Sequence, residues 1–450
     1  MVETYPNTSQ SGPKSSQLLF WALLICCHVA GATWNLTMGP WLLEDSAEYM
    51  FAAANLVEHQ TLYASDWSAA EHLDDYSKRP PLYPLLLIIT SSYQGQLIAL
   101  SLLQICFSIL SIWLISRLIQ THIQETIPWG LWAVALLFTP GQWMYPSLVM
   151  TEIFFQLLLV LLGYALIRAL ASRKMIWWIA AAGFVIAGFL TKPILYLFAV
   201  VFLVMGLIVG WKRKRLLIPL ITLVPVLSVL CYMSWNASRT GYFHVSSIQN
   251  LSLLQYTTTN LLIETYGEEE GIARADSILY LSLSQETYAR EQQQLQASCL
   301  EVIASDLPTY CWMHVRGMCN FFLDPGRFDI WSFCHVSDEG EGLLTVFSQS
   351  GYKGVIKSLM QKPPGWLMVL IAVFVINIVK SLGMMMFLMY HRKRMFSLIL
   401  LLLLLYISGL TGTSGAARFA LPIFPFLLIG LTIWPRITAS SKKKLWSIRS

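Results

Sequence analysis

The first polar loop of this chain, residues 39–81, holds the side chains that are best suited to chemistry. Glu44 and Asp45 stand near its start, and Lys78 and Arg79 stand near its end. The loop directly follows an apolar segment. Acidic residues follow the end of a predicted membrane helix, and basic residues precede the point where the chain re-enters the membrane. This arrangement indicates chemistry at the bilayer surface, on a substrate that presents its reactive group at that depth.

Asp45 is the first candidate for a catalytic group, as a general base that takes a proton from an attacking hydroxyl. The motif Asp45-Ser-Ala-Glu48 also has the form of an N-terminal capping box for a helix over residues 48–57. The spacing alone favours the cap, and the two roles are compatible. Glu44 and Glu48 are accessory acids, expected to be solvated or capping.

Four further acids, in the second half of this loop, are expected to form a solvated surface, with divalent-metal binding as the alternative. They are Asp66, Glu71, Asp74 and Asp75.

Glu152 is the second acid with a possible catalytic role. It opens an apolar run on the same side as the first loop. Ionisable groups at membrane depth are costly and are usually functional. The alternative is a carboxylate that only complements the positive end of a helix dipole.

Four basic residues stand at the outer ends of apolar runs: Arg79, Lys192, Arg239 and Arg418. Each alone could be a cation that reaches up to the bilayer interface, which is the commoner case. Together, on the face that bears the acids, they predict a site for a leaving phosphate, with Lys78 as an accessory. The sequence contains no P-loop, dinucleotide-binding or serine-hydrolase motif, so nucleotide binding and serine hydrolysis have no support.

The composition indicates the class of protein that must position these residues. Of 450 residues, 56% are hydrophobic and 12% are charged, against roughly 25% charged in soluble proteins. Apolar runs of about the length of a membrane-spanning helix recur from Leu18 to Trp434. We therefore expect an all-α polytopic membrane protein. The net charge of +5 does not indicate nucleic-acid binding, because the basic residues sit in short clusters beside the apolar runs.

The apolar runs predict about ten membrane spans. These are residues 18–38, 97–118, 128–150, 151–170, 176–190, 193–211, 216–235, 365–390, 395–410 and 418–434. The short fifth and sixth spans could instead form a re-entrant hairpin. Residues 82–93 are too short to cross and predict an interfacial helix.

Basic clusters then predict the orientation, because cytoplasmic loops are enriched in Lys and Arg. The clusters are Arg168 with Arg173-Lys174, Lys212–Arg215, His391–Arg394 and Lys442–Lys444. With ten spans and both termini in the cytoplasm, all four clusters lie inside. The 39–81 loop and residues 236–364 then lie outside.

This orientation divides the chain into five parts. They are a cytoplasmic N-terminus (1–17), a transmembrane core with the first outer loop (18–235), an extracytoplasmic domain (236–364), C-terminal transmembrane helices (365–434) and a basic cytoplasmic tail (435–450). The first span is interpreted as an uncleaved helix, with a signal peptide as the alternative. The outer domain is expected to contain a helix near residues 284–304.

Polar groups deep in the spans are expected to be few, with Lys380 the clearest. This expectation favours chemistry at the surface over transport through the bundle.

The eight cysteines divide into two groups. Four lie in apolar runs, and four lie in the outer domain: Cys299, Cys311, Cys319 and Cys334. The outer group permits two disulfides, which we favour over zinc because the spacings lack a Cys-x-x-Cys pair. Four free thiols remain open.

Several motifs, in their order along the chain, resemble those of GT-C glycosyltransferases. They are Asp45-Ser-x-x-Tyr49, Arg79-Pro-Pro-Leu-Tyr83-Pro84, Thr151-Glu152, Thr191-Lys192-Pro193, Trp235-Asn236 with Arg239, and Arg418-Phe-Ala-Leu-Pro422. The chain resembles the branch that holds protein O-mannosyltransferases, the aminoarabinose transferase of lipid A and RgtA/B/C/D-like enzymes. Tyr83 is an accessory site candidate.

That resemblance implies a polyprenyl-phosphate sugar donor and inverting transfer on the non-cytoplasmic face. It implies that Asp45 is the catalytic acid of the first loop, and that Lys192 and Arg418 meet the donor phosphate. Many relatives carry an acid directly after that Asp, where this chain has Ser46. This departure argues against a role for a metal or for a second acid in the loop. A divalent metal stays an open possibility, and no cofactor is otherwise expected.

The acceptor is expected to be a glycan, a lipid or a protein. The compartment is expected to be a bacterial inner membrane, with undecaprenyl phosphate as the carrier. The alternatives are a flippase for lipid-linked glycans and a ligase that uses a lipid pyrophosphate.

Overall fold

The computed structural model of this chain describes residues 14–336, 351, 353–354, 357 and 364–437. Every regular element among these residues is helical. Eight of the helices that they form are long and apolar enough to cross a membrane. The chain is therefore an all-α protein with the character of a multi-pass membrane protein. The basic cluster Lys442–Lys444 lies outside the described residues.

The eight long helical segments agree with eight of the ten predicted spans. They are Ser15–Met38, Leu97–Ile123, Glu152–Ala171, Pro193–Arg213, Leu217–Thr240, Pro364–Tyr390, Met395–Ser414 and Ala417–Ile437. Helix α8 (Ile176–Thr191), at the predicted fifth span, has only 16 residues. The predicted count of about ten spans is not confirmed.

The third predicted span, residues 128–150, is not one helix. Helix α5 (Trp129–Leu137) ends before Pro140, and α6 (Gly141–Met144) and the 3-10 turn η4 (Tyr145–Ser147) follow. The prediction of a continuous span here was wrong. Pro140 and Pro146 explain the difference, because proline has no N–H to donate and its ring disfavours the preceding helical turn.

Buried amide side chains compensate for this break. Gln104 of α4 (Leu97–Leu118) donates to the carbonyl oxygens of Pro146 and Leu148, at 3.2 and 2.8 Å. Gln142 and Gln156 exchange hydrogen bonds at 3.0 and 2.9 Å. Carbonyl groups without a helical partner need such donors inside an apolar bundle.

The expectation of a polar-poor interior was therefore wrong. His28 and Ser108 join the same region through a 2.8 Å hydrogen bond, and both are buried. These polar groups satisfy one another and the interrupted backbone.

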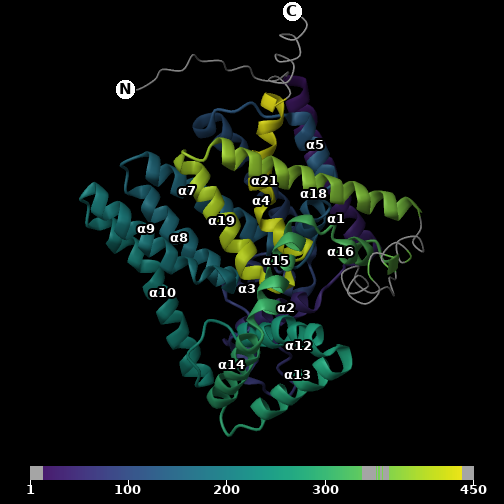
Figure 1. Cartoon of the computed structure of the whole chain (residues 1–450), viewed down its shortest axis with the longest axis vertical. Coiled ribbons are helices and arrows are strands. Elements are labelled where there is room, and N and C mark those ends of the chain that lie inside the picture. The colour runs from purple at the N-terminus through teal and green to yellow at the C-terminus, as the bar shows by residue number, and fades with distance from the viewer. Residues whose placement is uncertain (1–13, 337–350, 352, 355–356, 358–363, 438–450) are drawn as a thin grey trace, which may run out of the picture.

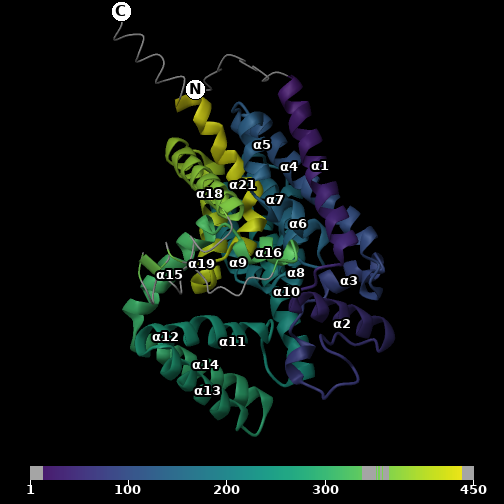
Figure 2. The same ribbon diagram turned by 90° about the vertical axis from the view of Figure 1, so that its right-hand side faces the viewer.

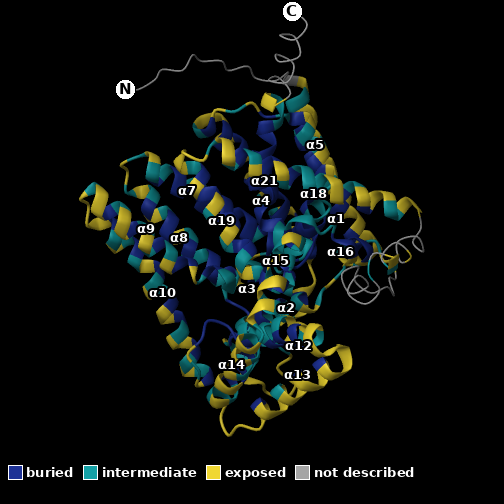
Figure 3. Ribbon diagram, in the orientation of Figure 1, coloured by how far each residue is buried: buried dark blue, intermediate teal, exposed yellow. Residues whose placement is uncertain are grey.

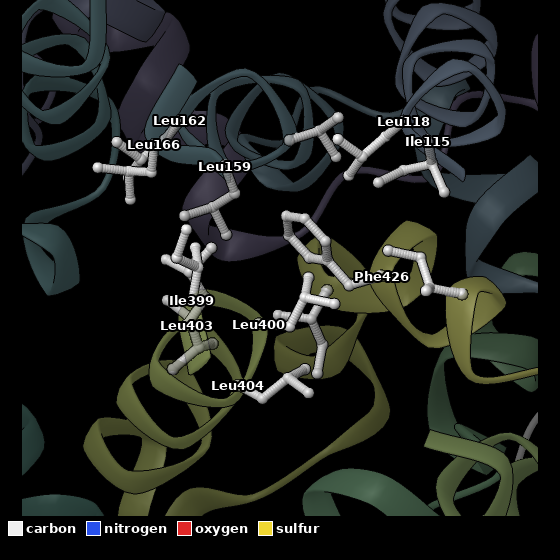
Figure 4. Packing of buried hydrophobic residues seen from close by; sticks show 14 of the residues in the cluster. Ile115, Leu118, Leu159, Leu162, Leu166, Ile399, Leu400, Leu403, Leu404 and Phe426 are labelled. Carbon is white, nitrogen blue, oxygen red and sulfur yellow. The ribbon is translucent and has the colours of Figure 1, made fainter. Parts of the chain in front are cut away.

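The centre of the bundle is α7 (Glu152–Ala171). Its leucines pack against α19 (Met395–Thr411) and α21 (Phe424–Gly430), as Figure 4 shows for Leu159, Ile399 and Phe426. Buried residues concentrate in these central helices, and exposed ones follow α9 (Phe198–Arg213), α10 (Leu217–Thr240) and α13 (Glu268–Leu283) (Figure 3). The exposed apolar face of α10 includes Leu220, Val224 and Leu227. A face of this kind suits contact with lipid.

Three described basic clusters meet at one end of the bundle. Arg213 donates to the carbonyls of Ala169 and Ser172, which joins the first two clusters. His391 and Arg436 both contact Glu125, at 3.1 and 2.7 Å. In Figure 2 the C-terminal helix reaches the top of the molecule, whereas α2 (Glu44–Glu58) and α3 (Leu82–Ile89) lie at the lower part of the bundle.

Residues 241–305 form a small helical unit beyond α2 and α3 (Figures 1 and 2). It contains α11 (Ile248–Ser252), the π-helical turn η6 (Leu253–Thr258), α12 (Thr259–Tyr266), α13 and α14 (Tyr288–Ser305). Its own core includes Leu254, Leu262 and Leu295. Helix α14 confirms the helix expected near residues 284–304, although it begins at Tyr288.

The chain returns from this unit to the bundle through two further helices. Helix α15 (Leu307–Leu323) packs against α18 (Pro364–Tyr390), α19 and α20 (Ala417–Ala420), and α16 (Arg327–Phe333) follows it. Residues 307–323 of the predicted outer segment therefore pack against the helices of the bundle.

The outer cysteines form no disulfide in the structure, so that prediction was wrong. All eight cysteines are free thiols. Cys299 is buried between α14 and its neighbours, and Cys311 and Cys319 are exposed on α15. Because Cys311 and Cys319 are eight residues apart on one helix, about 12 Å of axial rise separates them.

The close packing of α9 against α10 leads to a testable prediction about the stability of the protein. A Cβ at Gly206 would lie 1.9 Å from Oγ1 of the buried Thr222, whereas one at Gly183 would meet nothing within 4 Å. Gly206→Ala should lower the free energy of unfolding by about 1–3 kcal/mol. Gly183→Ala, the matched control, should leave it unchanged or raise it by up to about 1 kcal/mol. Thermal unfolding of the detergent-solubilised protein measures both, and equal melting temperatures would contradict the packing.

Candidate catalytic site

Asp45 lies in the first turn of α2, but it does not cap the helix. The cap position is Leu43, and the backbone N–H of Leu43 donates to Ser46 Oγ at 3.1 Å. The predicted capping box with Asp45 as the cap was therefore wrong. Ser46 makes the return contact instead, which leaves the carboxylate of Asp45 free to meet side chains from other segments.

Two arginines from distant parts of the chain hold the Asp45 carboxylate. Arg79 donates to Oδ1, and Arg418 donates to Oδ2. Partial burial raises the pKa of Asp45, but the two guanidinium groups outweigh burial and hold its pKa well below the usual range. Asp45 is thus a firmly ionised carboxylate with both oxygens engaged.

Glu152 begins α7 and is fully buried. Its Oε1 accepts from Arg418 Nε at 2.7 Å and from Lys192 Nζ at 3.2 Å. Its Oε2 is buried and has no hydrogen-bond partner within the described part of the chain. Arg418 therefore bridges Asp45 and Glu152 directly.

Glu48 extends the network on the other side. It accepts from Arg79 Nε at 2.7 Å and pairs with Lys78 Nζ at 2.7 Å. The Arg79 guanidinium also lies over the ring of Tyr49, 4.7 Å from its centroid. This set of seven residues is here called the charged cluster: Asp45, Glu48, Lys78, Arg79, Glu152, Lys192 and Arg418.

The charged cluster contains four cations and three carboxylates, and the Asp75 carboxylate lies 3.8 Å from Lys78 Nζ as a fourth acid at its edge. The exposure of the cluster is uneven. The side chains of Asp45 and Arg418 are 25% and 23% exposed, whereas that of Glu152 is 0%. Asp45 and Arg418 therefore belong to the partly exposed side of the cluster, as do Glu48 and Lys78, which are 22% and 21% exposed.

Three predicted site residues lie outside the charged cluster. Arg239 donates to Leu62 O at 3.2 Å and to Asn236 Oδ1 at 2.5 Å, and stacks on a tryptophan ring. Tyr83 packs on Tyr49 with ring centroids 5.0 Å apart. Glu44 is exposed. The structure thus brings together Asp45, Glu152, Arg79, Lys192 and Arg418, with Glu48 and Lys78.

Hydrogen bonds join the first loop to the outer helical unit, at loop residues that directly precede Arg79. Ser77 Oγ lies 2.6 Å from His244 Nε2, and Ser246 donates to the Lys78 carbonyl at 2.9 Å. Further along, Tyr288 of α14 donates to the Asp74 carboxylate at 2.6 Å. The outer unit therefore helps to position the basic return of the loop.

Sequence reasoning missed a cavity that lies beside Arg418. Its volume is about 60 Å³, and its lining includes Tyr145, Asp324, Asp329, Lys380 and Arg418. The signal in the sequence was the turn Asp324-Pro-Gly with a second acid shortly after it. Burial raises the pKa of Asp329 to about 6, although the Tyr145 hydroxyl hydrogen-bonds to it.

Lys380 lies at the cavity wall within α18 and is buried. Its ammonium group donates to Thr139 Oγ1 at 2.7 Å and lies 5.1 Å from the ring centroid of Phe424. It has no ion pair among the residues that the structure describes.

Within the described ranges, no group of three or more His, Cys, Asp or Glu side chains is arranged to hold a metal ion. Comparisons with protein-family models, with curated proteins and with solved structures give no match. The functional interpretation therefore depends on the geometry of the charged cluster and on the sequence motifs.

Arg418 should be important for stability as well as for chemistry. Arg418→Ala leaves the fully buried Glu152 with Lys192 alone, so it should lower the free energy of unfolding by about 3 kcal/mol. Arg290→Ala removes a 64% exposed partner of Glu286 and should cost less than about 0.5 kcal/mol. Chemical or thermal unfolding in detergent measures the difference, and an Arg418→Ala protein as stable as wild type would contradict the proposed dependence of Glu152 on Arg418.

Asp329 should make stability depend on pH. Because its pKa rises to about 6 on folding, from about 3.9 unfolded, the folded state binds the proton more tightly. That contribution is full below about pH 4 and is lost as the pH rises through about 6. Wild type should therefore lose about 2 kcal/mol relative to Asp329→Asn over this interval. Melting temperatures at several pH values test this; a constant difference, like that expected for the exposed Asp276→Asn, would contradict it.

Proposed function

We propose that this chain is a membrane glycosyltransferase of the GT-C type. It transfers a sugar from a polyprenyl-phosphate donor to an acceptor hydroxyl, with inversion at the anomeric carbon. The observation that carries the proposal is the meeting of Asp45 with Arg79 and Arg418, and through Arg418 with Glu152 and Lys192. A carboxylate base next to fixed cations suits displacement of a phosphate leaving group.

The roles within this proposal follow from the contacts. Asp45 removes the proton of the acceptor hydroxyl as the acceptor oxygen attacks the anomeric carbon. The sugar–phosphate bond breaks, and Arg418, Arg79 and Lys192 stabilise the charge that develops on the phosphate. Glu152 holds Arg418 and Lys192 in place through its Oε1. The phosphate is a good leaving group, so no strong general acid is required.

The proposed location is the non-cytoplasmic face of a bacterial inner membrane. The charged cluster gathers residues from the outer ends of the predicted spans, whereas the described basic clusters meet at another end of the bundle. Basic residues concentrate on the cytoplasmic side of membrane proteins, which supports this orientation.

The cations of the cluster are matched in number by carboxylates when Asp75 is included, and this balance favours the donor with the smaller negative charge, a lipid monophosphate sugar. Such a donor is a phosphodiester with one negative charge. A lipid pyrophosphate, as a glycan ligase would use, carries more negative charge, and the cluster has no surplus of cations to compensate it.

Transport of a lipid-linked glycan is the second candidate function. The cavity beside Arg418 reaches the buried Lys380, so a few polar groups line a space between the cluster and the bundle interior, although most of the lining is apolar. Its volume of about 60 Å³ has room for a few water molecules and not for a sugar. This size favours transfer at the surface.

Asp45→Asn should abolish sugar transfer while the protein stays folded and inserted. Without the carboxylate base, the rate should fall by at least about 100-fold. The assay incubates purified protein with labelled undecaprenyl-phosphate sugars and with membranes of the producing cell as the source of acceptor. Asp276→Asn, an exposed change on α13, is the matched control. Near-normal transfer by Asp45→Asn would refute the assignment, and labelled sugar that moves without a covalent product would indicate transport.

A further inference from the structure

Asp45 is poorly prepared to act as a base in the structure as it stands. Each of its two oxygens accepts a hydrogen bond from a guanidinium group. A carboxylate held in this way is a weak proton acceptor, because the positive charges stabilise its ionised form. Catalysis by Asp45 therefore requires that one of the two arginines be drawn away from it.

The two arginines differ in how firmly the protein holds them. The side chain of Arg79 is only 8% exposed, and it has Glu48 as a second carboxylate and the Tyr49 ring beneath it. The side chain of Arg418 is 23% exposed, and its Nε is engaged by Glu152 while its Nη2 points to Asp45. The Nη2 group of Arg418 is thus the donor that an incoming anion can take over.

We propose that the donor phosphate replaces Asp45 as the partner of Arg418 Nη2 and thereby releases Asp45 Oδ2 to act as the base. This inference depends on the proposed function and adds an order to it. The lipid-linked sugar binds first, and only then can the acceptor hydroxyl be deprotonated. Arg418 stays anchored to Glu152 during the exchange, so the phosphate arrives at a fixed position.

The chemical step balances with these groups alone. The acceptor oxygen forms a bond to the anomeric carbon, and its proton passes to Asp45 Oδ2. The bond between the anomeric carbon and the phosphate oxygen breaks, and its electron pair stays on the lipid phosphate. The extra negative charge lies next to Arg418, and Asp45 later returns its proton to water.

If Asp45 helped to bind the donor phosphate, Asp45→Asn would weaken that binding. The exchange predicts the opposite. If Asp45 and the phosphate compete for Arg418, then Asp45→Asn should bind undecaprenyl phosphate more tightly than wild type, by about tenfold. Binding is measured by titration of the purified protein in lipid nanodiscs. Uncharged undecaprenol is the control for the lipid chain, and Asp45→Asn should leave its binding unchanged.

Glu48→Gln is the matched control for electrostatics. It removes one negative charge from the same cluster, but Glu48 contacts Arg79 and Lys78 and makes no pair with Arg418. A general gain in positive potential would tighten binding equally in both variants. Competition at Arg418 should tighten it in Asp45→Asn, with less than about twofold change in Glu48→Gln.

The outcomes separate this inference from the proposed function. Tighter binding by Asp45→Asn alone supports the exchange. Suppose that wild type prefers undecaprenyl phosphate to undecaprenol. The exchange is then overturned, and the proposed function stands, if Asp45→Asn binds undecaprenyl phosphate no more tightly than wild type does. The same holds if Glu48→Gln tightens this binding as much as Asp45→Asn does. If wild type does not distinguish the two lipids, both are overturned.

A measurement on wild type covers the case in which Asp45→Asn does not fold. Carbodiimide-activated coupling of an amine to carboxylates is read by mass spectrometry at Asp45, with and without undecaprenyl phosphate. Release of Asp45 from Arg418 should increase its labelling at least about twofold, while labelling of the exposed Asp276 stays constant. Unchanged or reduced labelling of Asp45 on addition of the lipid overturns the exchange.

Discussion

The pairing of Arg418 with both Asp45 and Glu152 is the interaction on which the rest of this structure depends. Glu152 is fully buried, and a buried carboxylate without cations would be strongly destabilising. The Arg418 guanidinium pairs with its Oε1, together with Lys192, and at the same time holds the carboxylate of the first loop. The start of α7, the first loop and the beginning of the last span are therefore fixed relative to one another by a single side chain.

The same demand for paired polar groups shapes the interior of the bundle. The chain between α5 and α7 leaves the helical path, and carbonyl groups there lose their usual partners. Gln104 and Gln156 supply donors to them and to the Leu421 carbonyl at the last span. Irregular backbone inside an apolar bundle persists only where side chains satisfy it in this way. The irregular segments then bring Tyr145 close to Asp329 and the charged cluster.

A cluster in which every charged side chain is paired is stable, but its groups are unreactive while they stay paired. Within it, the paired side chains of Asp45 and Arg418 stay partly exposed. In the exchange that we propose, an anion that binds Arg418 competes with the carboxylate already in place, so binding and activation of the site are coupled. The cost of freeing a paired carboxylate is met by the new pair that the anion makes with the same guanidinium.

The sequence by itself determined the helical membrane class, eight of the long spans and the residue types of the site, because apolar run length and isolated charges at run ends are local properties. It did not predict the interruption near Pro140, the buried amides or the free outer thiols, since these depend on which carbonyls and thiols meet in space. Nor could it separate Arg239, which stacks on Trp235, from Arg418, which reaches Asp45 across 373 positions. Only the tertiary structure decided that, because an ion pair requires proximity and charge patterns along a chain do not define distance.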